Sequence, residues 1–255
     1  MAELEYFKLF VLVLARFSGL VVSAPVLGSA NFPMMAKAGF SALAALVITP
    51  TLLPFTTTLP NAPLAFALLG AGEFLIGVIL GFIMTLIFAA IQLAGQVIDL
   101  QTGFGMMNVF NPALETQFPI FGFFLFILGV LYLLVINGHH LMIRALVATY
   151  DHVPVGGFAA RPALLLDAAR LGQGMFADGL ALGAPLAAAM LLAYLTMGLL
   201  MRVVPQIHMF VVGFPLTIAI GLVLLALSIG VYLAALDGLF HQMFRDVDEL
   251  IRAMG

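Results

Sequence analysis

The sequence has no cysteine and few charged side chains. The absence of cysteine excludes disulfides, thiolate metal sites and thiol nucleophiles. Only 8% of the 255 residues are Asp, Glu, Lys or Arg, against about 25% in typical soluble domains. So little charge cannot cover the surface of a soluble globule, and it also excludes disordered and coiled-coil chains. The net charge of −3 offers no basic surface to nucleic acid, so we expect no nucleic-acid partner.

Apolar residues take the place of the missing charge. Aliphatic, aromatic and methionine side chains make up 64% of the chain, and the mean hydropathy is +1.22. Ordinary soluble domains reach about 45–50% even when glycine is counted. Two classes of protein remain: an integral membrane protein, or a subunit whose apolar surface is buried by its partners.

The apolar residues fall into six runs. A helix needs about 20 residues to cross a hydrocarbon core of about 30 Å. Helices are expected because backbone groups in lipid must find hydrogen bonds within the segment. The run at 64–100 is too long for one simple span, so it should extend beyond the hydrocarbon, tilt strongly or break. The runs cover residues 7–27, 38–53, 64–100, 120–150, 180–201 and 209–236.

Prolines and an amphipathic tail complete the predicted fold. Pro185 and Pro215 lie inside apolar runs and should kink or unwind them. Residues 238–254 place apolar and charged side chains on opposite arcs, which predicts an amphipathic helix that packs on a neighbouring helix. We therefore predict an all-α, hydrophobic, membrane-associated fold with broken or kinked helices and helical hairpins, in a single domain over residues 1–255.

A polar stripe follows the third apolar run. Thr85, Gln92 and Asp99 are spaced seven apart, and Gln96 lies four residues after Gln92, so all four share one face of a helix. Such a stripe faces either a water path or a partner helix. Plain hydrogen bonding between helices, with no transport role, explains the pattern equally well.

Two charges lie within apolar runs. Arg16 interrupts the first run and Glu73 lies near the start of the third. Because a charge at mid-membrane costs about 2.5–3.5 kcal/mol, each side chain should have a partner. A structural pair, or a segment that is not in lipid, is favoured over a role in ion coupling.

The segment 101–119 combines glycine and asparagine with bulky apolar side chains. Phe104, Met106, Met107 and Phe110 are of the kind that exposed loops usually avoid. Methionine is unbranched and adapts to irregular surfaces, so these four residues predict a channel plug or gasket. A re-entrant loop buried by its neighbours is the plainer interpretation, and the two can hold together.

Signs of enzymatic or metal chemistry are missing from the sequence. It has no HExxH motif, nucleophile elbow, P-loop or dinucleotide fingerprint. His139 and His140 are adjacent, but no Asp or Glu stands at helical ligand spacing from them before Asp151. We therefore expect no catalytic residues, no metal site, no cofactor and no enzyme activity.

Four passages of the chain together form a recognisable pattern. The most specific comprises Pro205, Gln206, Phe210, Gly213 and Pro215, and the others are Gln92–Gln96, Asn111-Pro112 with Pro119, and Asn137-Gly138-His139 leading to Val153–Gly156. In this order along the chain they resemble the FliR-type export-gate family of flagellar and virulence type III secretion systems. One departure is His208, where the family more often has asparagine.

The resemblance implies a function. Such proteins assemble with FliP-like and FliQ-like subunits, joined by FlhB-like and FlhA-like proteins, into a gate in the flagellar basal body. The gate passes unfolded proteins across the bacterial inner membrane, and a plug-like loop of this subunit lies in it. The family's apolar helices pack largely into the complex, with the rest facing membrane lipid, which would account for the overlong third run and the buried charges.

Two alternatives stay open at this stage. A virulence-type export-gate subunit would share the resemblance, although the Gly213-Phe214-Pro215 passage favours a flagellar system. A multi-pass secondary transporter of a small solute would suit broken helices and the polar stripe. The lack of an internal repeat and the apolar loop argue against the transporter.

Overall fold

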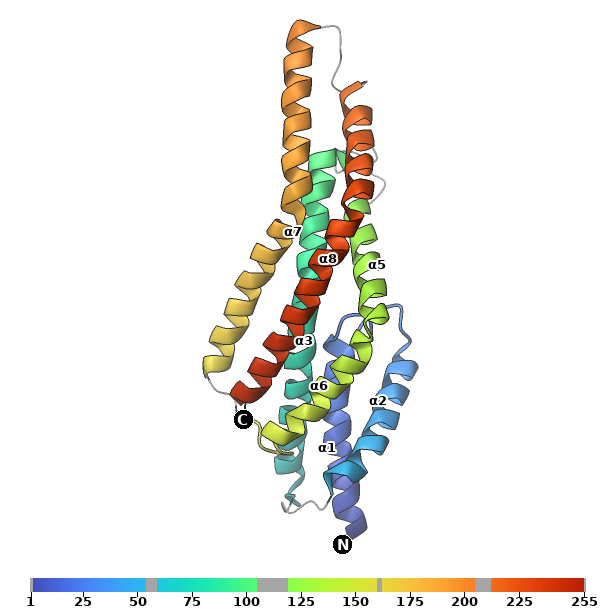
Figure 1. The fold of residues 1–255 in the computed structure, drawn as a ribbon. Coiled ribbons are helices and arrows are strands. Elements are labelled where there is room, and N and C mark those ends of the chain that lie inside the picture. Colours follow the sequence, from blue (N-terminus) through green and yellow to red (C-terminus); the bar gives the residue numbers. More distant parts are fainter. Residues whose placement is uncertain (1, 54–58, 105–118, 160–161, 205–211, 255) are drawn as a thin grey trace. The chain divides into compact units, whose positions relative to one another are not determined.

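A computed structural model describes residues 2–53, 59–104, 119–159, 162–204 and 212–254 (Figure 1). Within these ranges the ordered elements are all helices, which confirms the predicted all-α class. The elements are α1 (Ala2–Ser23), α2 (Met34–Ile48), the 3-10 helix η1 (Thr49–Leu52), α3 (Pro63–Thr102), α5 (Ile120–Val135), α6 (Gly138–His152), α7 (Pro162–Val203) and α8 (Phe214–Met254).

The third apolar run forms one continuous helix. α3 has 40 residues, or about 60 Å at 1.5 Å per residue, which is about twice the thickness of a hydrocarbon core. Of the three outcomes expected for this run, a break within it is wrong. No proline lies within the run, and its glycines Gly77, Gly81 and Gly95 lie where the backbone of α1 or α5 approaches closely.

The fourth run is broken at its centre. α5 ends at Val135, and α6 begins at Gly138. Asn137 between them has φ 56° and ψ 31°, the left-handed conformation, which asparagine tolerates better than most residues. The helix predicted to continue from 120 to 150 is therefore two helices, and the break belongs to the broken architecture that the sequence predicts.

The last two helices are longer than their apolar runs. α7 begins at Pro162, and its ribbon changes direction partway along (Figure 1). Pro185 lies inside this helix and does not end it. Pro215 does not interrupt a helix, because α8 begins at Phe214 and a proline in the first turn displaces no helical hydrogen bond. The amphipathic segment 238–254 is the last part of α8 and not a separate helix.

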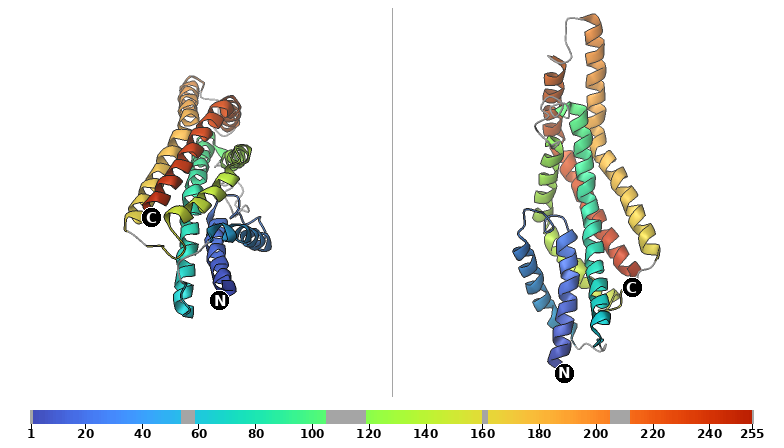
Figure 2. Two further views of the ribbon diagram at one scale, coloured as in Figure 1. Left: turned by 60° about the horizontal axis from the view of Figure 1, so that its bottom comes forward. Right: turned by 180° about the vertical axis from the view of Figure 1, so that it is seen from behind.

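The chain divides into two compact units, to which α3, α7 and α8 each contribute residues. The first unit comprises Met1–Leu86, Asn137–Leu171 and His241–Gly255. In it, α1 and α2 form an antiparallel hairpin (Figures 1 and 2). The core side chains, all at most 3% exposed, include Leu12, Val13, Phe17, Ile76, Leu80, Met84, Met243 and Val247. That the whole chain acts as one domain stays a prediction.

The second unit comprises Ile87–Ile136 and Gly172–Phe240. Its core is aromatic, because the Phe88 ring lies 5.6 Å from the Phe126 ring and 5.7 Å from that of Phe240. Helix α3 contacts its neighbours at glycines. A Cβ on Gly95 would overlap the Cα of Gly122 on α5, and one on Gly179 of α7 would lie 2.9 Å from the Ala90 carbonyl oxygen.

Much of the helical surface is apolar and exposed. Leu192 on α7 is 66% exposed and Leu227 on α8 is 77% exposed. Five helices among the described residues are long and apolar enough to cross a membrane, and six if α5 and α6 count as one span. Apolar faces of this extent require lipid or partner subunits to cover them.

Candidate functional site

A fully buried ion pair lies in the first unit. Nε of Arg16 on α1 donates to Oε2 of Glu73 on α3 at 2.6 Å, and neither side chain is exposed. The two charges that the sequence places within apolar runs are thus each other's partner. A short, charge-assisted hydrogen bond of this kind is among the stronger polar contacts in proteins.

The remaining polar atoms of the pair are satisfied from α6 and the turn after it. Arg16 Nη1 donates to Thr149 Oγ1 at 2.6 Å, and Nη2 donates to the Val153 carbonyl oxygen at 3.1 Å. The second Glu73 oxygen accepts from the Gly156 amide at 2.7 Å. The guanidinium carbon also lies 4.0 Å from the ring centroid of Tyr150, within cation–π range. The cluster therefore links α1, α3 and α6.

Small residues bring α1 and α3 close enough to form this pair. A Cβ on Gly77 would overlap the carbonyl oxygen of Arg16, and one on Gly19 would overlap that of Phe74. Further along, Thr85 Oγ1 donates to the Ser23 carbonyl oxygen at 2.8 Å, at the end of α1. Such close backbone contact at small residues is typical of helices that pack in membranes. With both charges enclosed and bonded, the geometry favours the structural interpretation of the pair over ion coupling.

In the second unit, Asp99 of the polar stripe connects α3 to α5. Its Oδ1 accepts from the Phe121 amide and its Oδ2 from the Gly122 amide, both at 3.0 Å. These amides belong to the first turn of α5, where backbone N–H groups have no partner within the helix. Pro119 precedes this helix and supplies no side-chain cap. Asp99 therefore caps α5 from a residue distant in sequence and orders its first turn.

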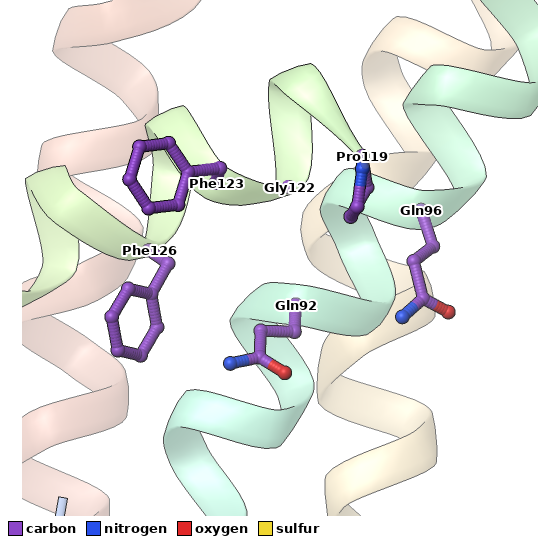
Figure 3. A pocket seen from close by; sticks show the side chains of 6 residues that line it. All are labelled: Gln92, Gln96, Pro119, Gly122, Phe123 and Phe126. Atoms are coloured by element: carbon purple, nitrogen blue, oxygen red, sulfur yellow. The ribbon is translucent and has the colours of Figure 1, made fainter. Parts of the chain in front are cut away.

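Gln92 and Gln96, the middle of the stripe, are exposed on α3. They line an open groove of about 240 Å³ between α3 and α5, opposite Phe123 and Phe126 (Figure 3). Pro119 and Gly122 complete its lining. The stripe is thus divided: Thr85 and Asp99 bind helix backbone, whereas the two glutamines face the groove.

The structure places Phe104 alone among the four predicted plug residues. Its ring meets the ring of Phe121 on α5 edge to face, with centroids 5.4 Å apart. The residue before it, Gly103, has φ +87° and ends α3 in a conformation that side chains rarely adopt. Met106, Met107 and Phe110 lie outside the described residues, so the plug stays a prediction.

The family signature is described only at its end. Gly213 directly precedes α8, and Pro215 lies in the first turn of that helix. Pro205, Gln206 and Phe210 lie outside the described residues.

The adjacent histidines contact each other. Their rings have centroids 4.1 Å apart. In the described ranges, no three His, Asp or Glu side chains are grouped so as to hold a metal ion.

Sequence reasoning did not identify the groups that complete the Arg16 cluster. Thr149 and Gly156 lie more than 80 positions from their partners, and nothing in their local pattern points to Arg16 or Glu73. A weak signal existed, because Val153 and Gly156 belong to one of the passages that carry the family resemblance. Residues that meet only in the folded chain leave no periodicity for a sequence analysis to find.

Comparison with known proteins places this architecture in a family. The chain belongs to family 1 of the bacterial export proteins, whose model matches residues 7–243.

Its relatives include flagellar biosynthetic proteins named FliR. The protein of Escherichia coli (strain K12) is 32% identical over 97% of this chain and 94% of its own length. That of Pectobacterium carotovorum is 35% identical over 94% and 90%, and that of Bacillus subtilis (strain 168) 29% identical over 99% and 98%. The chain is therefore a component of the flagellar export apparatus, and neither the virulence-type alternative nor the solute transporter is favoured.

Proposed function

We propose that this chain is a core subunit of the flagellar type III export gate and helps to form and seal the channel for unfolded flagellar proteins. It assembles with FliP-like and FliQ-like subunits and adjoins FlhB-like and FlhA-like proteins, in the inner membrane at the flagellar basal body. It acts as one domain and catalyses no reaction. The family match over residues 7–243 is the observation that carries this proposal.

The exposed apolar surface supports an assembled subunit. Several large apolar side chains on α7 and α8 are at least 60% exposed. They are Leu191, Leu195 and Val203 on α7, and Leu227 and Val231 on α8. An isolated monomer would need detergent over the whole of these faces. Partner helices that bind the folded chain would stabilise it by mass action.

The contacts on either side of residues 105–118 support a plug. At one end Gly103 terminates α3 and Phe104 packs on Phe121, and at the other Asp99 holds the first turn of α5. All these contacts lie within the second unit, so the residues on both sides of the segment 105–118 are held by the same two helices, α3 and α5. A seal needs such a frame, with apolar residues between that exclude water and ions from the path.

Co-purification tests the assembly. The tagged chain should purify with FliP-like and FliQ-like subunits when they are expressed together, and should aggregate or lose thermal stability when it is expressed alone. A stable, monodisperse monomer in mild detergent that captures neither subunit would overturn the proposal.

Ion leakage tests the seal. The variant carrying Phe104→Ala, Met106→Ala, Met107→Ala and Phe110→Ala should raise small-ion conductance and slow growth, with the complex still assembled. The matched control replaces Phe124 and Leu131, exposed apolar residues of α5, with alanine, and should not leak. Unchanged conductance in an assembled plug variant would show that the loop only packs.

A further inference from the structure

Two members of the polar stripe differ from the other two in their contacts. Gln92 and Gln96 are exposed one helical turn apart on α3, and neither amide finds a hydrogen-bond partner in the part of the chain that the structure describes. By contrast, Thr85 binds the end of α1 and Asp99 caps α5. Two amides one turn apart, exposed on a helix with few charged side chains, are therefore available to bind a partner.

The groove that these amides line is uncharged and half apolar. Both glutamines leave the same side of α3, and Phe123 and Phe126 on α5 lie across from them (Figure 3). Its remaining lining is Pro119 and Gly122. A site of this composition offers hydrogen bonds and apolar contact, and it discriminates against neither sign of charge.

The spacing of the amides fits an extended polypeptide. Residues four apart on a helix are separated by about 6 Å along its axis. In an extended chain, backbone groups that point to the same side recur every two residues, or about 6.6–6.8 Å. A glutamine side chain both donates and accepts, so it can pair with a backbone N–H or C=O whatever the residue. The aromatic rings opposite can receive the side chains that point away from α3.

We propose that Gln92 and Gln96 form a binding site for the backbone of an extended polypeptide, and that its occupant is the unfolded protein in transit. This inference rests on the proposed function of the chain as an export-gate subunit. The amides bind the polypeptide backbone, which all substrates share, and the neutral groove accepts side chains of either charge. The site thus holds substrates of unrelated sequence weakly and in an extended form.

Site-specific crosslinking tests the occupant. A photoreactive phenylalanine analogue replaces Phe123 in the groove, or its exposed neighbour Phe124 outside it, in cells that contain the whole export complex. The substrate is a flagellar protein fused to a stably folded domain that stalls it in the gate. We expect a crosslink to the stalled substrate from position 123 and none from position 124. The product should change mass with the substrate used.

Export rates test the amides themselves. The double variant Gln92→Leu/Gln96→Leu keeps the volume and removes the hydrogen bonds, and the control Gln173→Leu alters an exposed glutamine of α7 in the same unit. One hydrogen bond is worth about two- to tenfold in an equilibrium. The double variant should therefore export two substrates of unrelated sequence at least about threefold more slowly. Complex yield and ion leakage should stay at parental values, as they should in the control.

The contrary outcomes separate this inference from the proposed function. A crosslink of constant mass with every substrate would assign the groove to a partner subunit, and labelling of lipid alone would assign it to the bilayer. Either result, or a parental export rate in the double variant, would overturn the backbone-binding site and leave the gate function intact. If deletion of the whole chain left export unchanged, the proposed function itself would fail.

Discussion

Nε of Arg16 lies 2.6 Å from Oε2 of Glu73, although the residues are 57 positions apart and neither is exposed. The remaining polar atoms of the pair, Nη1 and Nη2 of Arg16 and Oε1 of Glu73, form hydrogen bonds with Thr149, Val153 and Gly156. A buried pair of this kind adds little net stability compared with a well-packed apolar pair, but the loss of one partner is severe. Its main effect is to fix the relative positions of α1, α3 and α6.

Removing one charge of the pair should destabilise the protein strongly. Glu73→Leu leaves the Arg16 guanidinium buried without a counter-charge and should cost about 3–5 kcal/mol, whereas Arg16→Met/Glu73→Leu should recover most of that loss. Thermal unfolding of the purified complex measures both. Asp248→Asn, which breaks the exposed pair with Arg252, serves as control and should change little. A Glu73→Leu complex as stable as the parent would contradict the role of the pair.

The approach of α1 to α3 should depend on Gly77. Gly77→Ala places a methyl group against the Arg16 carbonyl oxygen, forces the helices apart and should cost about 1–3 kcal/mol. Gly39→Ala on α2 is the matched control, because a Cβ there meets nothing within 4 Å. It should stabilise the helix by about 0.5–1 kcal/mol. The midpoints of heat-induced loss of folded complex compare the two variants, and equal midpoints would refute the close contact.

The cap on α5 should be measurable at Asp99. Asp99→Ala removes the acceptor for both the Phe121 and Gly122 amides and should cost about 0.5–2 kcal/mol. Asp99→Asn keeps one acceptor oxygen and should lie between alanine and the parent. Hydrogen exchange of the first turn of α5 reports this directly, and protection should fall in the order Asp, Asn, Ala. Unchanged protection in the alanine variant would assign the cap to another group.

A charge on the apolar arc of the last helical segment should disrupt the fold. Val247 is 1% exposed, and Phe244 beside it is half-buried. Val247→Asp buries an unpaired carboxylate at a cost of several kcal/mol, and Phe244→Asp should cost less. Arg245→Asp, on the exposed arc, is the control. Yield of the complex and swimming motility should fall together for Val247→Asp and remain near normal for the control. Normal motility in Val247→Asp cells would show that the arc is not buried in the working complex.

The helices of this fold could be predicted from composition and period, but their ends could not. The apolar run 64–100 fits α3 within a few residues, because lipid-compatible sequence and helix coincide there. α7 starts at Pro162, well before its run at 180, since the amphipathic stretch at its beginning also forms helix. The break at Asn137 depends on one residue in a left-handed conformation within an apolar run. A hydropathy profile gives no signal of a left-handed residue within an apolar run.

The candidate site, too, could be predicted only in part. The stripe on α3 could be found because all its members lie on one helix, whose period is known in advance. The requirement that Arg16 and Glu73 have partners followed from the energetics of burial. That they bind each other, and that Asp99 reaches Phe121 and Gly122, depends on how helices distant in sequence meet, which a single sequence does not encode in any local pattern.

Because the Asp99 carboxylate binds the first turn of α5 directly, the stability of that turn should not depend on how many residues separate the two helices. The closure entropy of a chain segment between two fixed points grows only with the logarithm of its length, by about 0.6 kcal/mol for a doubling. Changes in the number of residues between positions 104 and 119 should therefore leave the cap on α5 in place, because Asp99 binds the Phe121 and Gly122 amides directly.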